Sequence, residues 1–440
     1  MTEPQPTAGL LSNEIRPYAW GSTTAIAELT GRAPTGRPEA ELWMGAHPGA
    51  PSLLDRGAGP EPLTDIIARD PGRELGTSTG HRFGGRLPFL LKILAAGHAL
   101  SVQVHPDNDQ ARAGYAAEQA AGIPLDAPHR IYKDPHHKPE LICALDDFDA
   151  LCGFREPAAT AALLTPLDTP ALTPWLDVLR TAAPATALRT VLTQALGSER
   201  ERGVRAAAEL APALEHAARR GGPGAPTYAA FAAAARDHPG DPGLVAALLL
   251  NHVTLRPGQA LFLDARVPHA YLRGTGVEIM ANSDNVLRCG LTPKHVDVDA
   301  LTGIVDFRPC APAFVRPMAG ADGELHYPAP AAEFALSRLD VLGSATVDGR
   351  GPQILLCLDG TAELTQHPGA PVALGRGDSV FVPGTGAPAQ LRGTATLYRA
   401  TVPGSGLPEE PPCPPPRPAP PHRHRGERGA AAGRSTPPAP

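Results

Sequence analysis

Short apolar runs separated by glycine and proline dominate two stretches of the chain, at about residues 10–155 and 253–402. Runs of this length between turn residues are typical of β-strands. In the second stretch, a glycine turn, an apolar run and a proline-bearing turn follow one another twice, at 257–268 and 376–383. This repetition favours two jelly-roll barrels.

The stretch between them is rich in alanine, leucine and arginine and predicts helices. Apolar positions within 202–220 have the spacing of an amphipathic helix, but Pro212 lies inside this segment. A proline in a helix interior removes a hydrogen bond and clashes with the preceding turn, so we expect a kink or a division into two helices.

The predicted fold class is therefore mainly β with a helical insertion. The expected parts are a first jelly roll (1–156 and 251–320), an all-α insertion (157–250), a degenerate second jelly roll (321–402) and a tail (403–440). The tail is rich in proline, glycine and arginine and poor in large apolar residues. We expect it to be disordered, because it cannot bury enough surface to offset its ordering entropy.

The composition excludes several classes of protein. The 440 residues carry a formal net charge of −6 and form no basic stripe, so we expect no nucleic-acid partner. The N-terminus lacks the basic and apolar regions of a signal peptide, and no apolar run is long enough to cross a bilayer, so we expect no membrane partner. The six cysteines show no CxxC spacing, which is typical of reduced thiols in a cytoplasmic protein.

Three strand-like runs contain the candidate chemistry. Gln103 and His105 are two positions apart in one run, so on a strand their side chains share a face. His269 follows the proline that ends another run, and Glu140 stands at the start of a third. Two imidazoles, a carboxylate and an amide on facing strands can bind a metal and leave room for a substrate. The spacing also resembles the two cupin motifs, with Gln103 where a first histidine is usual.

Six strings, taken together, resemble the type I mannose-6-phosphate isomerases. They lie at 18–21, 41–48, 90–94, 103–107, 137–140 and 284–294. The likeness runs in order from about residue 18 to 299 and continues more weakly to about 402. This family also has an all-helical insertion between the two halves of its catalytic β domain, which matches the predicted helical stretch.

The resemblance implies an activity and a set of site residues. The family is zinc-dependent and interconverts mannose 6-phosphate and fructose 6-phosphate, so it implies a sugar-phosphate substrate, one zinc ion per chain and a tendency to be monomeric. The implied zinc ligands are Gln103, His105, Glu140 and His269, and the implied active-site arginine is Arg288. The implied substrate-pocket positions are Ser101, Lys138, Tyr271, Glu278, Asp284 and Lys294.

The chemistry leaves the proton-transfer group open. Aldose–ketose isomerisation moves a proton between C1 and C2 through an enediolate, whose charge a divalent cation can stabilise. Arg288 is not the base, because a guanidinium stays protonated, so we expect it to pair with the enediolate oxygen or the phosphate. Lys138, Glu278 and Lys294 are candidate bases, and the sequence does not choose among them.

Two other functions are compatible with a cupin fold. A cupin oxygenase needs iron and an open site for O₂, usually with an all-His or His/Glu ligand set. Gln103 as a ligand and the lysine and arginine residues disfavour this alternative. A sugar-binding cupin without activity has no need of Arg288 and Lys138, and both are present.

The second jelly roll is expected to have a structural role. When its glycine turn at Gly377 is aligned with Gly258, Pro388 stands at the position of His269. We find no nearby pair of ligands two positions apart, so we expect no metal there.

Overall fold

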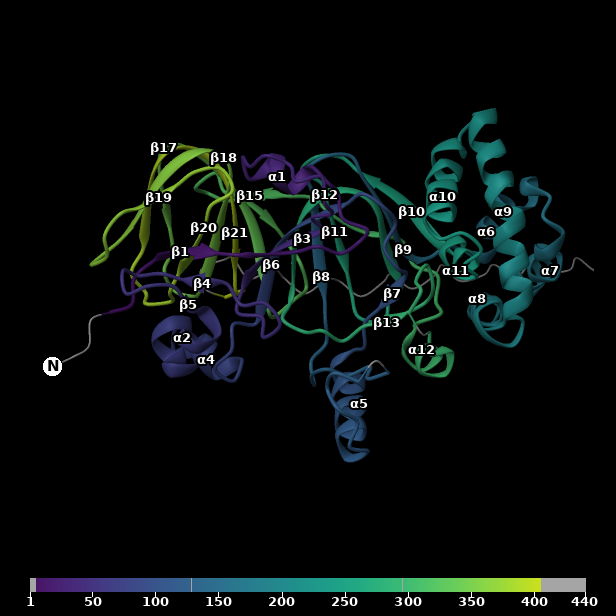
Figure 1. The fold of residues 1–440 in the computed structure, drawn as a ribbon, viewed down its shortest axis with the longest axis horizontal. Coiled ribbons are helices and arrows are strands. Elements are labelled where there is room, and N and C mark those ends of the chain that lie inside the picture. The colour runs from purple at the N-terminus through teal and green to yellow at the C-terminus, as the bar shows by residue number, and fades with distance from the viewer. Residues whose placement is uncertain (1–4, 128, 295, 405–440) are drawn as a thin grey trace, which may run out of the picture. The chain divides into compact units, whose positions relative to one another are not determined.

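The computed structural model describes residues 5–127, 129–294 and 296–404. Their strands form two β-sheets of 11 and 10 strands, accompanied by a group of helices (Figure 1). The prediction of a mainly β fold with a helical region is confirmed. Within the described ranges, the strand pairings do not close either sheet into a barrel.

The 11-stranded sheet contains the strands that carry the candidate site. They are β2 (Glu14–Arg16), β3 (Glu41–Gly45), β6 (Phe89–Ala96), β7 (Gln103–Val104), β8 (Glu140–Ala144), β9 (Phe148–Phe154), β10 (Leu250–Leu255), β11 (Ala260–Leu263), β12 (His269–Ala281), β13 (Leu287–Arg288) and β14 (Ala313–Val315).

The long strand β12 joins two layers of this sheet. Its first half pairs with β7 and β9, and its second half pairs with β6 and β8. Gly274 lies at the change, with φ +123°. A Cβ atom there would lie 2.7 Å from the Cα atom of Phe148, so only glycine fits both the backbone conformation and the space.

Successive side chains of β12 pack alternately into two different hydrophobic cores. Ala270 and Leu272 pack with the helices, whereas Tyr271 packs on the opposite side with Phe148 and other strand residues. Side chains on a strand point alternately to its two faces. His269, two positions before Tyr271, therefore faces away from the helices.

Residues 157–250 form the predicted helices. They are α6 (Pro157–Leu164), α7 (Thr173–Thr181), α8 (Pro184–Thr193), α9 (Arg200–Arg220), α10 (Ala225–Asp237) and α11 (Gly243–Leu248). The other helices are α1 (Ala25–Leu29), α2 (Leu63–Arg69), α3 (Pro71–Leu75), α4 (Thr77–Arg82), α5 (Asn108–Ala120) and α12 (Val298–Ile304). None of the described helices combines the length and the apolar character needed to span a bilayer.

Helix α9 corrects one expectation, because Pro212 does not divide it. The helix is assigned as continuous over 21 residues with the proline inside. Leu210 and Leu214, on either side of the proline, are buried in the helical core. Their packing stabilises the helix and compensates for the hydrogen bond that the proline removes.

The 10-stranded sheet contains most of the C-terminal part. Its strands are β1 (Gly9–Ser12), β4 (Leu53–Leu54), β5 (Glu61–Pro62), β15 (Met318–Ala319), β16 (Leu325–Tyr327), β17 (Ala335–Val347), β18 (Gln353–Gln366), β19 (Val372–Leu374), β20 (Ser379–Val382) and β21 (Ala389–Thr401). Strand β1 pairs with β20, and β4 pairs with β1. The N-terminal segment thus contributes to the second sheet, which differs from the expectation that residues 1–156 belong to the first jelly roll. Pairing between segments so remote in the chain leaves no trace in the local apolar pattern.

A buried ion pair ties strands of the second sheet together. Arg399 on β21 forms bonds of 2.8 and 2.9 Å to the two oxygens of Glu324, and its Nη1 lies 3.2 Å from Gln353. Ser337 also donates to Glu324. All these side chains are buried, so each charge depends on its partner.

We predict that Glu324→Gln is strongly destabilising. The change leaves the Arg399 guanidinium buried without a counter-charge, which costs about 3–5 kcal/mol. Urea unfolding monitored by circular dichroism measures the loss. The matched control is Asp340→Asn, which breaks the partly exposed 2.9 Å pair with Arg338 and should cost less than about 1 kcal/mol. Equal losses in the two variants would contradict the assignment.

Candidate functional site

Three neighbouring strands place candidate residues side by side. In the register of the sheet, Gln103 on β7 lies opposite both His269 on β12 and Arg288 on β13. Residues directly opposite each other on antiparallel strands point to the same face, with Cβ atoms about 4.5–5.5 Å apart. An imidazole, an amide and a guanidinium therefore form a row on one face of the sheet.

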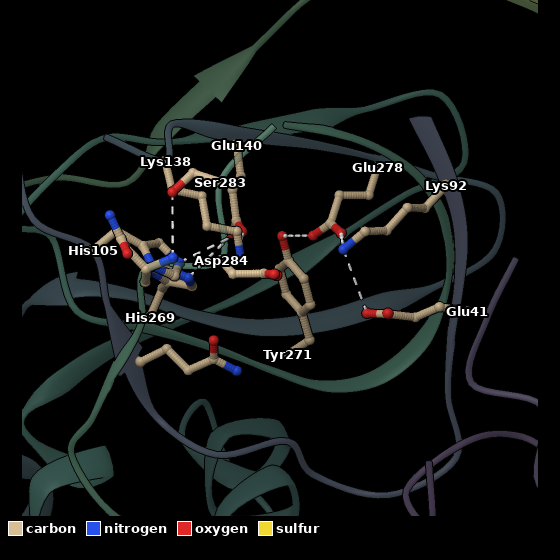
Figure 2. Close-up of polar contacts among 12 residues, drawn as sticks. Glu41, Lys92, His105, Lys138, Glu140, His269, Tyr271, Glu278, Ser283 and Asp284 are labelled. Atoms are coloured by element: carbon tan, nitrogen blue, oxygen red, sulfur yellow. Dashed lines mark hydrogen bonds and ion pairs between the residues drawn. The ribbon is translucent and has the colours of Figure 1, made fainter. Parts of the chain in front are cut away.

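His105, Glu140 and His269 converge on one point. Their ligand atoms lie within 4.8 Å of one another, and all three residues are buried. The Nε2 atoms of His105 and His269 lie 3.5 and 3.3 Å from the two oxygens of Glu140. Lys138 completes the group, with its Nζ 2.9 Å from Glu140 Oε1 (Figure 2).

The other nitrogen of each imidazole faces a backbone carbonyl. His105 Nδ1 is 2.7 Å from the oxygen of Asn285, and His269 Nδ1 is 3.0 Å from that of Val267. A carbonyl only accepts, so Nδ1 carries the proton and Nε2 is an acceptor directed toward Glu140. Within the described ranges, His105 Nε2 is buried without a hydrogen-bond partner. Metal-binding histidines are usually held in this way.

Local electrostatics favour the deprotonated forms that metal ligands require. Burial, and then the charge of Lys138, lowers the pKa of His105 to about 4, so this ring is neutral at pH 7. Burial alone would raise the pKa of the Glu140 carboxyl, but Lys138 and His105 hold it well below its usual range. The group thus presents neutral imidazole and carboxylate.

The residues present fit a zinc ion. Zinc binds nitrogen and oxygen at about 2.0–2.2 Å in a tetrahedron, so neighbouring ligand atoms are about 3.4 Å apart. The separations of 3.5 and 3.3 Å between the imidazoles and Glu140 match this value. Gln103 lines a cavity next to this group. Its amide N–H donates to Ser101 Oγ at 3.3 Å, which leaves its amide oxygen available as a ligand.

A second buried polar group extends from Tyr271 toward β3 (Figure 2). The Tyr271 hydroxyl and Lys92 Nζ donate to the two oxygens of Glu278, each at 2.9 Å. Lys92 Nζ also lies 3.6 Å from Glu41, which accepts a 2.7 Å bond from the indole of Trp43. Burial alone would lower the pKa of Lys92, but the carboxylates around it raise it above its ordinary value. Both oxygens of Glu278 are therefore engaged.

A cavity of about 790 Å³ lies over this row of residues. Its lining includes the predicted site residues Ser101, Gln103, Lys138, Asp284, Arg288 and Lys294. The remaining predicted residues, His105, Glu140, His269, Tyr271 and Glu278, are buried and do not line this cavity. The structure thus gathers the predicted set but places Glu278 and Tyr271 behind the cavity wall.

One part of the cavity wall is positively charged. Burial lowers the pKa of the half-buried Arg288, and no neighbouring carboxylate offsets this shift. The charge of Arg288, more than burial, lowers the pKa of Lys294. Asp284, a conceivable partner for Arg288, instead lies 3.2 Å from the buried ring of His47. Two neighbouring cations that have no counter-ion among the described residues favour an anionic ligand.

Lys92 and Glu41 also belong to the site, although neither was among the predicted site residues. Both line the cavity, and both lie in strands that are otherwise mostly apolar. A charged residue within an apolar run, such as Lys92, or at its start, such as Glu41, needs partners when buried, because an unpaired buried charge is very costly. This was the signal that could have identified them.

A second group of possible ligands was also missed. Asp322, Glu324 and His326 bring three ligand atoms within 4.8 Å of one another. The expectation of a metal-free second jelly roll concerned the surroundings of Pro388, and this group lies elsewhere, so that expectation stays a prediction. Glu324 is already bound to Arg399, and Asp322 is exposed, so this group is better interpreted as a structural turn.

A buried His/His/Glu donor set beside a lysine, next to a cavity with a positive wall, is typical of metal-dependent enzymes that act on small anions. Comparisons with known proteins all point to one enzyme family. The family model described as phosphomannose isomerase type I, catalytic domain, matches residues 10–157. Mannose-6-phosphate isomerase of Escherichia coli K12 is 40% identical over 396 residues, covering 88% of this chain and 98% of that protein. The human mannose-6-phosphate isomerase is 33% identical, covering 84% of this chain and 92% of that protein.

Similar solved structures belong to the same family. A crystal structure of zinc-bound mannose 6-phosphate isomerase matches with a TM-score of 0.82 and 39% identity, covering 90% of this chain and 100% of that chain. A second match, with the same TM-score, identity and coverage, is a point mutant of phosphomannose isomerase from Salmonella typhimurium. The chain belongs to the type I mannose-6-phosphate isomerase family.

We predict that His269→Ala removes bound metal, because a four-ligand site tolerates the loss of a ligand poorly. His252→Ala is the matched control: the side chain of this histidine is also largely buried but pairs with Asp149 at 3.2 Å, away from the cluster. Metal analysis after dialysis should find about one equivalent in the control and little in His269→Ala. A full equivalent in His269→Ala would exclude this residue as a ligand.

Proposed function

We propose that this protein is a zinc-dependent mannose-6-phosphate isomerase, which interconverts mannose 6-phosphate and fructose 6-phosphate. One zinc ion per chain is held by Gln103, His105, Glu140 and His269. The observation that carries this proposal is the buried donor set next to the cavity wall, where Lys138 touches Glu140 and where Arg288 has no carboxylate partner among the described residues. Family membership supports the choice of metal and substrate.

The substrate is expected to lie along the cavity. The Ser101 hydroxyl accepts a bond from Gln103, so its own proton is free for a substrate oxygen. We propose that Ser101 and Lys294 bind the phosphate, and that Arg288 pairs with the enediolate oxygen or with the phosphate. Asp284, exposed at the cavity and adjacent to His47, is proposed to accept a bond from a sugar hydroxyl.

Among the three candidate bases, we assign proton transfer between C1 and C2 to Lys138. It lines the cavity and touches the proposed ligand Glu140, so it lies close to the reacting carbons. Glu278 has both oxygens engaged, and Lys294 lies near Arg288. When bound, zinc supplies a Lewis acid for the oxygens at C1 and C2, where charge develops. Glu278 then serves to fix the Tyr271 ring.

The finer structural expectations are also proposals. We propose that the β parts are a catalytic jelly roll, 1–156 with 251–320 apart from the N-terminal strands that join the second sheet, and a degenerate second jelly roll, 321–402. The insertion 157–250 interrupts the first of them. A cytoplasmic, monomeric protein is proposed as well, since the five described cysteines are free. The predicted disordered tail lies almost entirely outside the described residues.

We predict that the purified protein converts mannose 6-phosphate to fructose 6-phosphate in a coupled assay. A chelator should abolish the activity and added zinc should restore it, because the ion stabilises the charge of the transition state. Binding of the sugar phosphate without turnover would favour a sugar-binding protein. Oxygen consumption with iron would favour the oxygenase. Either result would overturn the proposal.

We predict that Arg288→Ala lowers kcat by on the order of 10²–10³-fold, as for other preorganised donors to a developing oxyanion. Arg288→Lys should recover little, because a point charge on a flexible stem does not reproduce the planar fork. Steady-state kinetics with metal analysis provides the measurement, and metal content should stay unchanged. If only KM rises, Arg288 binds the phosphate in substrate and transition state alike.

A further inference from the structure

The connection between α10 and α11 contacts one wall of the cavity. Asp237 Oδ2 accepts the N–H of Ala99 at 2.8 Å, and His238 Nε2 donates to the carbonyl of Ala99 at 2.8 Å. Both backbone polar groups of Ala99 are thus bound by the helical insertion. Asp237 Oδ1 also lies 2.9 Å from His98 Nδ1. Ser101 follows two positions later and lines the cavity.

The same connection holds the opposite wall through Asp241. Its Oδ1 accepts the N–H of Gly243 at 2.7 Å, and its Oδ2 accepts the N–H of Thr292 at 2.8 Å. Thr292 Oγ1 in turn accepts the N–H of Lys294 at 3.1 Å. One carboxylate therefore joins the start of α11 to the loop that carries Lys294.

Close backbone packing reinforces this second contact. A Cβ atom on Gly243 would lie 2.4 Å from the Cα atom of Gly290, so the two chains meet without an intervening side chain. The next residue, Leu291, is buried and has φ +52°, which is rare for a residue with a side chain. Such a conformation persists only when its surroundings hold it, and here the insertion does so.

These contacts add to the backbone bonds that hold the two loops, such as the 2.9 Å bond from the N–H of Leu100 to the carbonyl of Tyr271 on β12. The N–H of Val102 donates to the carbonyl of Gly290 at 3.0 Å, and the carbonyl of Val102 accepts the N–H of Cys289 at 2.7 Å. At this position the two cavity walls are therefore hydrogen-bonded to each other. Beyond it, Ala99 on one side and Thr292 on the other are bound by the insertion. The insertion thus binds both loops at positions next to the cavity.

Resting on the proposed function, we propose that residues 237–243 are a positioning element for the phosphate-binding loops. Asp241 does not line the cavity and acts only through backbone N–H groups, whereas Asp237 and His238 line the cavity as well as holding Ala99. They fix the backbone from which Ser101 and Lys294 reach the phosphate. A binding group acts at full strength only when its support is rigid, so loosening either loop should weaken phosphate binding and spare the chemistry at C1 and C2.

The test uses the full-length zinc enzyme with Asp241→Ala, Asp241→Asn and Asp237→Ala. Asp241→Ala should raise KM for mannose 6-phosphate and Ki for inorganic phosphate together, each on the order of tenfold, since two hydrogen bonds to a charged group are lost. Asp237→Ala should shift both constants in the same direction, because it frees the backbone that leads to Ser101. Asp241→Asn keeps an acceptor for one of the two N–H groups and should lie between wild type and alanine. The values of kcat and the zinc content should stay within about twofold of wild type.

Glu209→Ala is the matched control. Glu209 is an exposed carboxylate of the same insertion that accepts the N–H of Ala171 at 3.1 Å, away from the cavity. Its KM and Ki should equal those of wild type. The inference is overturned if Asp241→Ala and Glu209→Ala behave alike, or if kcat and zinc fall while Ki for phosphate is unchanged. Absence of isomerase activity in wild type would refute the proposed function instead, and phosphate calorimetry on the same variants would then test the positioning role directly.

Discussion

Glu140 has to remain charged inside the protein, and the arrangement around it follows from this requirement. A buried carboxylate is very costly unless cations and hydrogen-bond donors surround it. Lys138 supplies the cation at 2.9 Å, and the two imidazoles beside Glu140 are oriented by backbone carbonyls, one of which belongs to Asn285. Asn285 is itself buried and binds the backbone of residues 133–136, the segment that leads to Lys138. A single charge thus fixes the geometry of several loops.

Strand β12 carries residues of both buried polar groups. His269 lies at its start and Glu278 near its end, so the donor set and the Lys92 pair are linked by one continuous backbone. Gly274 allows the strand to pass from one layer to the other between them. The helical insertion packs on the outer face, so it can influence the cavity only where its loops reach over the edge of the sheet, as Asp241 does.

Much of this could be predicted from the sequence because the signals are local. Apolar runs between turn residues identify strands, and the alanine-rich stretch identifies helices. Two-residue spacing places Gln103 and His105 on one face. The continuity of α9 through Pro212 and the pairing of β1 with β20 were not predictable in this way, because both depend on packing partners that are remote in the chain. Lys92 was overlooked for the same reason: its three carboxylate neighbours come from three other strands.

The sequence by itself determined the donor types, their placement on strands and the family to which the chain belongs. The tertiary structure decided which candidate groups are free to act. It engages both oxygens of Glu278 and leaves Arg288 without a carboxylate, although the sequence presents both as equally available. It also decides that the helical insertion reaches the cavity. The physical reason is that hydrogen-bond and charge partners are chosen by distance in space, and strand register and loop packing bring together residues that local patterns treat as unrelated.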